Sequence, residues 1–594
     1  MLKRFILNTL SSFVGTWLAV MLFGVVAFLV IIGIGVKLGN SSASSGVSKH
    51  SILTLDLKGV IDEREAAITP DYTMLLNRGI DRPQTLDVIS KALREAAVNK
   101  NIDALYIKCG IVSASPATLD AIRNEVVEFK KSGKKVYAYG DVMMSGAYYV
   151  ASTADSIFIN PYGSVEMSGL SSTSLYMKGL FDKIGISWQV VKVGTFKSAV
   201  EPYTMDSMSE PARAQLDTLF GNMWGYMRER ICENRKKLTP AKIDSLINVV
   251  SITFAPVEDA VSSGLVDKAV YERTMDSRLA SLVKKDKKDL KFVSPGDLVE
   301  ENSFSAAPGG KNQIAVIYAT GEIVDGSSSG IDYNKLVPVI TDLADNDKVK
   351  GLVLRVNSPG GSAFGSDQIG EALDYFQSKG KPLAVSMGDY AASGGYWISC
   401  GADVIYADPL TITGSIGIFG LIPNGEVLLE KIGVNPQFAG TNPQANFPTL
   451  FKPMDERQLA VVQKNVERGY DRFINRVANG RKMSPERVRQ IAEGRVWDAI
   501  KAKQIGLVDN LGGLQDAIDW TAKKASVDGN YSLSIYPELK PSFWNLIADG
   551  GAFEKMAAEM MNQGSFTDFT IEYLRRYLGR EHIQALMPDF KVGF

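Results

Sequence analysis

An internal repeat constrains the fold of this chain more than any other feature of its sequence. Residues 140–150 (GDVMMSGAYYV) lie 248 positions before residues 388–398 (GDYAASGGYWI), and residues 183–186 lie the same 248 positions before residues 431–434. Three more matching pairs follow the same order, residues 51–61 with 313–324, 102–108 with 349–355, and 134–141 with 381–389. Five matching segments in one order indicate a tandem duplication.

Each repeat is predicted to consist of alternating strands and helices. Short apolar runs alternate with helical patterns such as residues 116–132 and 367–379. This alternation is typical of β-α units that form a largely parallel sheet. The interval 211–250 carries apolar residues at helical spacing and predicts long helices.

The predicted fold class is α/β, with two duplicated β-α domains preceded by one N-terminal transmembrane helix. The predicted segments are an N-terminus, anchor and linker over 1–46, a first domain over 47–285, a linker over 286–312, a second domain over 313–531, and a C-terminal extension over 532–594. The linker is predicted from its polar composition, which includes Pro-Gly-Asp and Pro-Gly-Gly.

The C-terminal extension is rich in aromatic residues. An amphipathic pattern near residues 570–586 predicts a terminal helix. We interpret this helix as a docking or interface element.

An uncharged segment near the N-terminus predicts a membrane anchor. Residues 11–36 carry no charged side chain, and as a helix they would span about 39 Å, enough to cross a bilayer of roughly 30 Å with some tilt. The apolar region of a cleaved signal peptide is shorter, about 7–15 residues. Lys3 and Arg4 precede the segment, so the positive-inside rule places the N-terminus in the cytoplasm and the body of the chain outside.

Charge and histidine content exclude several classes of protein and site. The chain has 65 basic and 66 acidic residues, and this balance predicts no nucleic-acid binding. Its two histidines, His50 and His582, lie in no motif, so a Ser-His-Asp triad or a histidine-based zinc site is not expected. Cys109, Cys232 and Cys400 are far apart and show no CxxC spacing. We expect no metal and no cofactor.

A candidate nucleophile lies in the second repeat, at a predicted turn from strand to helix. Residues 383–387 form a short apolar run typical of a buried strand, and a glycine interrupts the run. Ser393 follows with Gly394 and Gly395 beside it, and residues 396–398 predict a helix start. A serine at such a turn can expose its hydroxyl beside the free N–H groups of the helix. The same pattern is also typical of a serine N-cap after a glycine turn.

A lysine is the remaining candidate for a base, because burial can lower its pKa towards neutrality. Lys197 follows a β-rich run and a Gly-Thr turn and is flanked by Phe196, although the pattern alone is also typical of a surface lysine. The second repeat has no lysine at the equivalent place, residues 437–446, whereas a serine is kept in both repeats as Ser145 and Ser393. This divergence predicts that the first repeat supplies the lysine and the second the serine.

A third candidate feature is the strand and glycine turn at residues 353–362 (VLRVNSPGGS). Glycines allow close approach of the backbone, and their N–H groups can join that of Gly394 around a developing oxyanion. The first repeat, at residues 106–113, lacks the Pro-Gly-Gly turn. Only the second repeat is therefore expected to stabilise an oxyanion, although a simple β-turn also explains these residues.

Four segments carry a family resemblance. They are Asn357–Ser362 (NSPGGS), Ala392–Tyr396 (ASGGY), Thr413–Gly417 (TGSIG) and Thr195–Tyr203 (TFKSAVEPY). In combination they resemble the signal peptide peptidase A family, also called the protease IV family, in its long tandem form. The resemblance covers nearly the whole chain, from the N-terminal anchor to about residue 530.

This resemblance implies a membrane-anchored serine endopeptidase with Clp-protease/crotonase-like domains, a Ser-Lys dyad and an acyl-enzyme intermediate. The implied site residues are Ser393 as nucleophile and Lys197 as general base, Ser415 as a residue that orients the lysine, and Gly394 with Gly360 or Gly361 as oxyanion donors. The implied partners are signal peptides and other apolar peptides, the membrane and a homotetramer. The implied location is a bacterial inner (cytoplasmic) membrane, crossed once, with the catalytic body on the periplasmic or extracytoplasmic side.

Three alternatives remain open from the sequence. A crotonase-type acyl-CoA enzyme would share this kind of fold, although the serine, the lysine and the anchor argue against it. A catalytically inert assembly scaffold is the second alternative, since one repeat has lost its site. The third is an envelope quality-control protease that acts on misfolded exported proteins.

Overall fold

A computed structural model provides the description of most of the chain. The described residues are 47–64, 84–248, 257–299, 312–326, 330–538 and 583–586. The predicted anchor at residues 11–36 lies outside these ranges. None of the helices within them is long and apolar enough to cross a membrane.

The first repeat forms a parallel sheet that has six strands in the described residues, in the order β6-β4-β3-β2-β1-β7. The strands of this repeat are β1 (Ser51–Val60), β2 (Ile102–Ser113), β3 (Lys135–Met144), β4 (Ser156–Glu166), β5 (Ser187–Val193), β6 (Lys268–Ala269) and β7 (Lys291–Val293). Its α-helices are α3 (Leu86–Val98), α4 (Pro116–Lys131), α5 (Ser145–Ala151), α6 (Lys178–Ile184), α7 (Glu201–Thr204), α8 (Glu210–Asn234), α9 (Pro240–Asn248), α10 (Val257–Ser263), α11 (Glu272–Leu282) and α12 (Pro295–Leu298). Residues 104–107 of β2 are all buried, as expected where helices cover both faces of a parallel sheet.

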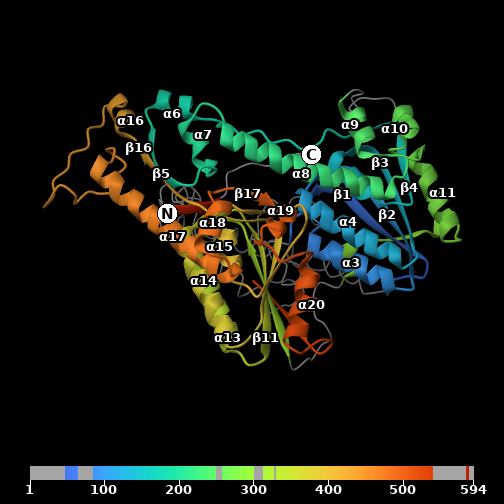
Figure 1. The fold of residues 1–594 in the computed structure, drawn as a ribbon. Helices are drawn as coiled ribbons and strands as arrows, with labels where there is room; N and C mark the ends of the chain where they lie inside the picture. The colour runs from blue at the N-terminus through green and yellow to red at the C-terminus, as the bar shows by residue number, and fades with distance from the viewer. Residues whose placement is uncertain are drawn as a thin grey trace, which may run out of the picture.

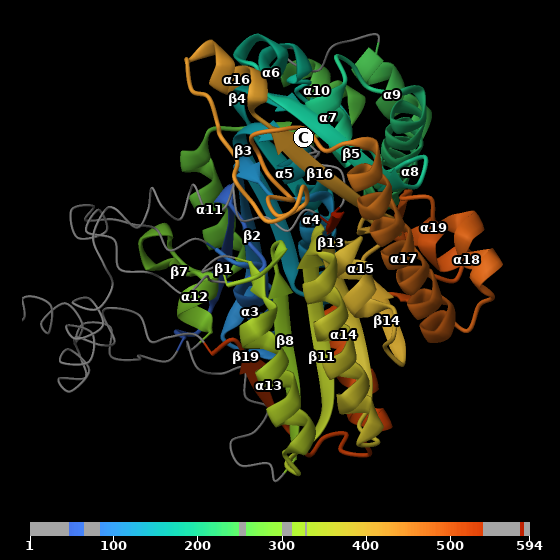
Figure 2. The same ribbon diagram turned by 90° about the vertical axis from the view of Figure 1, so that its left-hand side faces the viewer.

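The second repeat forms a larger sheet with the order β17-β15-β13-β11-β8-β19, in which β14 also pairs with β13 and β18. The strands of this repeat are β8 (Gln313–Thr320), β9 (Ile323–Val324), β10 (Ile331–Asp332), β11 (Val349–Ser358), β12 (Gly360–Ser362), β13 (Leu383–Ala392), β14 (Val404–Ala407), β15 (Ile412–Gly414), β16 (Ile418–Asn424), β17 (Val496–Asp498), β18 (Asn510–Leu511) and β19 (Ser532–Tyr536). Its α-helices are α13 (Tyr333–Asp345), α14 (Ala363–Ser378), α15 (Gly394–Ser399), α16 (Glu426–Lys431), α17 (Glu456–Arg481), α18 (Pro485–Ile491), α19 (Ala499–Gln504) and α20 (Leu514–Lys524). Helices α13 and α14 lie over β8 and β11 (Figure 2).

The predicted α/β class and the predicted duplication are confirmed by these elements. Strands β3 and β13 have equal lengths and lie 248 positions apart, and α4 and α14 also correspond. Two segment boundaries differ from the prediction. Strand β7 falls in the predicted linker and pairs with β1, and β19 falls in the predicted C-terminal extension and pairs with β8. Each repeat therefore adds a late strand beside its first strand.

A third sheet contains strands from both repeats, in the order β10-β9-β12-β20-β16-β5. Strand β5 comes from the first repeat, and β9, β10, β12 and β16 come from the second. Strand β20 (Ile583–Leu586) comes from the C-terminal extension. The prediction of a helix over 570–586 is therefore wrong for residues 583–586, because these residues pair as a strand with β12 and β16.

The two repeats pack closely against each other. In Figure 1, the sheet of the first repeat lies on the right, and the second repeat lies on the left and below. Elements β5, α6 and α7 of the first repeat lie at the upper left near α16 and β16, and α8 runs along the top from α7 towards the first sheet. The hydrophobic core of the first repeat includes Ala392, Ile412 and Val496 of the second. Arg355 of β11 binds Glu63 through two contacts of 2.8 and 3.1 Å, and both side chains are buried. The relative position of the repeats is thus fixed by apolar packing and by buried polar pairs.

Candidate active site

Ser393 lies at the turn between β13 and α15. Its backbone has φ 55° and ψ −116°, a conformation that costs energy for a residue other than glycine. The turn is held by a hydrogen bond of 2.8 Å from Ser393 N to Gly414 O. The sharp turn places Ser393 directly before Gly394, the first residue of α15, where backbone N–H groups have no partner within the helix.

Strand register brings Ser415 beside Ser393. Strands β13 and β15 are parallel neighbours in which Ala392 pairs with Gly414. Ser393 directly follows Ala392, and Ser415 directly follows Gly414, so the two serines lie side by side at the ends of these strands. Ser415 also has a positive φ, 49°, and its N–H donates to Arg495 O at 2.7 Å.

Pairing between the repeats brings Lys197 to the two serines. Strands β5 and β16 are antiparallel, and Val193 at the end of β5 pairs with Ile418 at the start of β16. Lys197 follows β5 and Ser415 precedes β16, so both lie at the same end of this strand pair. Lys197 Nζ lies 2.8 Å from Ser393 Oγ, and 3.1 Å from both the carbonyl oxygen and the hydroxyl oxygen of Ser415.

The amine of Lys197 is in an environment that favours its neutral form. Lys197, Ser393 and Ser415 have no exposed surface. Burial lowers the pKa of Lys197 well below its ordinary value, because the charged form loses its hydration. The three oxygen atoms in contact with Nζ belong to hydroxyl or carbonyl groups, which carry no formal charge to offset this effect.

The hydrogen bonds around Lys197 Nζ indicate which group donates and which accepts in each contact. The Ser415 hydroxyl donates to Gly494 O at 3.3 Å, so its oxygen accepts one N–H of the amine. The carbonyl oxygen of Ser415 accepts a second N–H. A neutral amine has two N–H groups and one lone pair, and the lone pair is then left for the hydroxyl proton of Ser393. The arrangement can therefore remove a proton from Ser393.

Gly494 is a positioning residue that the sequence does not identify. Its φ is 73°, and a Cβ at this position would lie 2.7 Å from the Cβ of Lys197 and 2.8 Å from its backbone N. The neighbouring Glu493 accepts hydrogen bonds from the Thr195 N–H at 3.0 Å and the Thr195 hydroxyl at 3.1 Å. The Glu493-Gly494 pair thus fixes the segment that carries Lys197. Nothing in the sequence relates these two residues to a lysine almost 300 positions earlier.

The predicted oxyanion turn packs against the start of α15, because a Cβ at Gly395 would lie 2.6 Å from Ser358 O. Gly360 and Gly361 have φ values of 107° and 145°, which favour glycine. A Cβ at Gly361 would lie 2.2 Å from Ile323 O. The N–H of Gly360 donates to the Ser358 hydroxyl at 3.1 Å. The turn thus brings glycine backbone close to the site, although in this structure the Gly360 N–H is bonded to Ser358.

Ser145 has a different environment from Ser393, although both follow equivalent strands. Its hydroxyl donates to Glu166 O at 3.3 Å and accepts from Ser168 N at 3.2 Å. Ser145 begins α5, and its φ is not positive. The serine of the first repeat is therefore a buried hydrogen-bonding residue of the fold, and the structure does not bring a lysine to it through any described contact.

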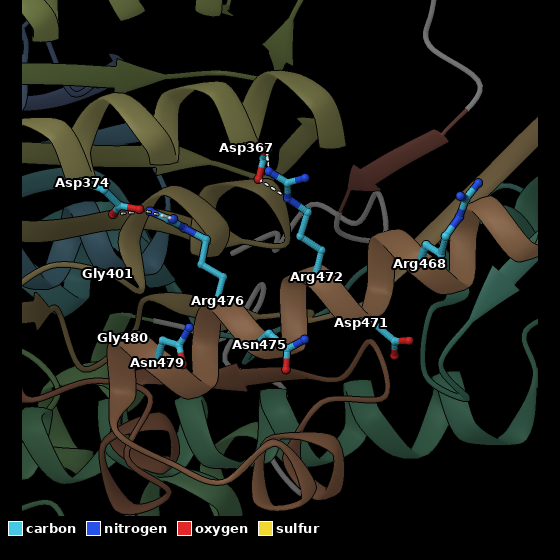
Figure 3. A pocket seen from close by; sticks show the side chains of 10 residues that line it. All are labelled: Asp367, Asp374, Gly401, Arg468, Asp471, Arg472, Asn475, Arg476, Asn479 and Gly480. Atoms are coloured by element: carbon cyan, nitrogen blue, oxygen red, sulfur yellow. Dashed lines mark hydrogen bonds and ion pairs between the residues drawn. The ribbon is translucent and has the colours of Figure 1, made fainter.

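A polar pocket of about 730 Å³ lies between α14 and α17 (Figure 3). Its charged side chains form ion pairs, among them Arg476 with Asp374 at 2.8 Å. Arg476 Nε also donates to Trp397 O of α15 at 3.2 Å. None of the predicted site residues lines this pocket. Its arginine links α17 to the helix that follows Ser393, so the pocket is part of the support of the site.

No group of three or more His, Cys, Asp or Glu side chains that could hold a metal ion occurs among the described residues. A buried serine in contact with a buried lysine of lowered pKa, on a duplicated α/β fold, has the features of a serine hydrolase.

Comparisons with known proteins agree with this class. The profile of Peptidase family S49 matches residues 128–286 and 375–528, one match in each repeat. Protease 4 of Salmonella typhi is 34% identical over 536 residues, which cover 88% of this chain and 86% of that protein. Protease 4 of Haemophilus influenzae is 35% identical over 502 residues, which cover 80% of each chain. Serine protease SPPA of Arabidopsis thaliana chloroplasts is 28% identical over 512 residues, which cover 84% of this chain and 72% of that protein.

The chain belongs to peptidase family S49 and is a serine protease. The resemblance to the signal peptide peptidase A (protease IV) family is confirmed, including its duplicated form.

Proposed function

We propose that this protein is a membrane-anchored endopeptidase that hydrolyses signal peptides and other apolar peptides through Ser393 and Lys197. The observation that carries the proposal is the contact of 2.8 Å between Lys197 Nζ and Ser393 Oγ, formed without solvent exposure. Burial lowers the pKa of Lys197 and so favours the neutral amine that a general base requires.

The reaction would proceed in two halves. Lys197 Nζ takes the proton of the Ser393 hydroxyl while Oγ bonds to the peptide carbonyl carbon. Backbone N–H groups at Gly394 and at Gly360 or Gly361 stabilise the resulting oxyanion. The C–N bond then breaks, and Lys197 returns its proton to the leaving amine. In the second half, water attacks the acyl-enzyme, Lys197 takes one proton from that water, and Ser393 recovers its hydroxyl as the carboxylate product leaves.

The location and assembly are part of the same proposal. Residues 11–36 form a single-pass anchor in a bacterial inner membrane, and the catalytic body lies on the periplasmic or extracytoplasmic side. This orientation is supported by Lys3 and Arg4 before the segment. The active form is a homotetramer, an expectation that rests on the family resemblance and that sedimentation of the detergent-solubilised chain would test.

The proposed function is tested by hydrolysis of an apolar signal-peptide substrate by the full chain. We expect Ser393→Ala and Lys197→Ala to abolish turnover and Ser145→Ala to retain it. Lys197→Arg is also expected to be inactive, because a guanidinium does not release its proton near neutral pH. Equal cleavage by all of these variants would assign the activity to another site and would overturn the proposal.

A further inference from the structure

Strand β13 changes its neighbour in the sheet shortly before the candidate nucleophile. Residues 384–387 pair with β14, whereas residues 390–392 pair with β15. The strand passes from one neighbour to the other at residues 388 and 389. Since β15 leads directly to Ser415, this change of neighbour is the reason that Ser393 lies beside Ser415. The residues at the change therefore determine where the nucleophile leaves the sheet.

Asn357 of β11 faces the same point from the other side of β13. Between two neighbouring pairs of these strands, β11 has one residue, Asn357, and β13 has three, residues 388–390. Such a bulge disrupts the backbone hydrogen bonds of the sheet, and the amide of Asn357 replaces them. Its Oδ1 accepts from Tyr390 N at 3.1 Å, and its Nδ2 donates to Asp389 Oδ2 at 3.1 Å. Asn357 thus holds the bulge, and the next residue, Ser358, begins the oxyanion turn.

Asp389 connects this bulge to the first repeat. Its Oδ1 accepts from the Thr118 N–H at 3.1 Å and from the Thr118 hydroxyl at 2.8 Å, and also from the Ser115 hydroxyl. Ser115 is the N-cap of α4, where backbone N–H groups lack helical partners and a negative charge is favoured. Each carboxylate oxygen of Asp389 therefore has its own partner, which is α4 for Oδ1 and Asn357 for Oδ2.

The first repeat does not have this arrangement, although it keeps an aspartate at the same place before its serine. That aspartate is Asp141, which accepts from the Tyr139 hydroxyl at 3.0 Å and from the Asn160 amide at 2.7 Å, both within its own repeat. Where the second repeat has Asn357, the first has Gly110, which carries no amide side chain. The Asn357–Asp389 pair is therefore specific to the repeat that carries the nucleophile.

We propose that Asn357 and Asp389 are positioning residues of the active site, through which α4 of the first repeat fixes the place of Ser393 relative to the oxyanion turn. This inference rests on the proposed function, because it takes Ser393 and the Gly360 turn as parts of one site. Asn357 lies on the strand that leads to the turn, and Asp389 lies on the strand that leads to Ser393. Their contact sets the offset between the two strand ends, and a displacement of about 1 Å at such a site can lower the rate about 100-fold.

An exchange of the two side chains tests the pair. Asn357→Asp places two carboxylates in contact, and Asp389→Asn places two amides in contact, so each single variant loses hydrogen bonds of the pair. In the double variant, the carboxylate and the amide change places. The carboxylate then accepts from Tyr390 N and from the amide, and the amide oxygen accepts from α4, so each hydrogen bond again has a donor and an acceptor.

Steady-state hydrolysis of the signal-peptide substrate by the full chain measures the effect. We expect each single variant to lower kcat at least about tenfold with little change in KM, because the pair acts on the geometry of the transition state. The double variant should return to within about threefold of the wild-type kcat. Asp141→Asn is the matched control and should leave kcat unchanged. Single variants with the wild-type kcat, or a double variant no more active than the single ones, would overturn the inference.

A substitution in α4 tests the contribution of the first repeat with little change in shape. Thr118→Val removes the hydroxyl that donates to Asp389, whereas Thr118→Ser keeps it. We expect Thr118→Val to lower kcat about threefold or more and Thr118→Ser to stay near wild type, since the hydrogen bond is made to a charged group. Equal kcat values in these two variants would remove α4 from the inference.

Labelling with an alkyl fluorophosphonate, followed by intact-mass measurement, separates this inference from the proposed function. Ser393 Oγ bonds to phosphorus, fluoride leaves and Lys197 takes the proton, so no peptide is needed. If the wild-type chain hydrolyses no peptide but the labelling rates are lowered in the single variants and restored in the double variant, the proposed function fails and the positioning role stands. If peptide hydrolysis occurs with the same kcat in all variants, the proposed function stands and the positioning role is wrong. A wild-type chain that neither hydrolyses peptide nor reacts with the probe would overturn both.

Discussion

Lys197 differs from an ordinary lysine because the oxygen atoms within 3.1 Å of its Nζ all belong to Ser393 and Ser415. Two of these oxygens accept N–H groups of the amine, and the third belongs to the hydroxyl that must lose a proton. The arrangement fixes where the lone pair points, and burial lowers the pKa of the amine, which favours a lone pair without a proton. At the scale of single residues, therefore, the lowered pKa of the Lys197 amine and the orientation of its lone pair have separate structural causes.

The orientation of the Lys197 amine depends on Gly494. In Gly494→Ala, the new Cβ would lie 2.7 Å from the Cβ of Lys197, so the lysine must shift. We expect kcat to fall at least about 100-fold, since a displacement of about 1 Å can cost that much. Gly433→Ala is the matched control, because Gly433 has a similar φ of 75° but no atom within 4 Å of its added Cβ. Steady-state kinetics of both variants makes the comparison, and an equal loss in both would remove Gly494 from the account.

The neutral amine has a consequence for stability. The folded chain holds Lys197 at a pKa below its ordinary value, so the unfolded chain binds an extra proton between the lowered pKa and the ordinary one. The contribution of this group to the free energy of unfolding therefore rises with pH across that window. Lys197→Met removes the free-energy cost of burying an amine that is protonated in the unfolded chain. We expect this variant to be inactive but more stable at pH 7 by about 1–2 kcal/mol. The difference should shrink towards pH 10, and chemical denaturation at several pH values would measure it. A less stable Lys197→Met chain at pH 7 would contradict a buried neutral lysine.

At the scale of secondary-structure elements, the two repeats have become complementary. The first repeat has β5, whereas the described residues 433–455 at the equivalent place in the second form no strand. The second repeat has β16, whereas residues 170–176 at the equivalent place in the first form no strand. Strands β5 and β16 pair with each other, so each repeat supplies the strand that the other lacks. This exchange brings the lysine of one repeat to the serine of the other.

Helix α17 supports the helix that follows Ser393. Phe473 stacks on Trp397 with ring centroids 4.5 Å apart, and a Cβ at Gly480 would lie 2.1 Å from Cys400 O. Gly480→Ala must therefore push α17 away from α15, and we expect a loss of roughly 1–3 kcal/mol of stability together with lower activity.

Gly221 of α8 provides the matched control for this substitution. It lies inside the equivalent long helix of the first repeat, and no atom lies within 4 Å of its added Cβ. Gly221→Ala should be neutral or stabilising by up to about 1 kcal/mol, because alanine is the better helix former. Thermal unfolding and peptide hydrolysis would compare the two variants, and equal stability of both would show that α17 does not brace α15.

The sequence is sufficient to predict the β-α units and the strand-to-helix turn, because both depend on local patterns. The apolar run over 383–387 and the glycines after Ser393 locate β13 and α15. The pairing of β5 with β16 is not local, and neither strand has a counterpart in the other repeat that could reveal it. Strand β20 was predicted as helix for the same reason, since its partners β12 and β16 are far away in sequence and tertiary pairing overrides local periodicity.

At the scale of the whole molecule, the repeats are joined through buried and half-buried polar groups. Asp389 of the second repeat accepts from the Thr118 N–H at 3.1 Å and the Thr118 hydroxyl at 2.8 Å, at the start of α4 in the first. Asp408 of the second repeat lies against Asp120 of α4 in the first, and Asp408 also accepts from Leu410 N at 2.9 Å. Burial, and then the charge of Asp120, raise the pKa of Asp408 well above its ordinary value.

The Asp408 carboxyl group makes the junction sensitive to pH. Because its pKa is higher in the folded chain, the folded chain keeps a proton that the unfolded chain loses, and its contribution to stability falls as pH rises above about 4. Asp408→Asn keeps a hydrogen-bond donor towards Asp120, and its amide does not titrate, so this loss of stability with rising pH is removed. We expect Asp408→Asn to be more stable at pH 7, by roughly 1–3 kcal/mol, and similar to wild type near pH 4. Unfolding midpoints between pH 4 and 8 would test this, and a difference that does not vary with pH would contradict it.

The central claim is that two repeats build one active site per chain, with Ser393 activated by Lys197. Its most direct test is reaction of the full chain with a serine-acylating probe at several pH values, followed by intact-mass measurement and peptide mapping. The account predicts one adduct per chain, located on Ser393, with a rate that rises with pH through the lowered pKa of Lys197 and no adduct in Lys197→Met. An adduct on Ser145, or undiminished labelling of Ser393 in Lys197→Met, would contradict it.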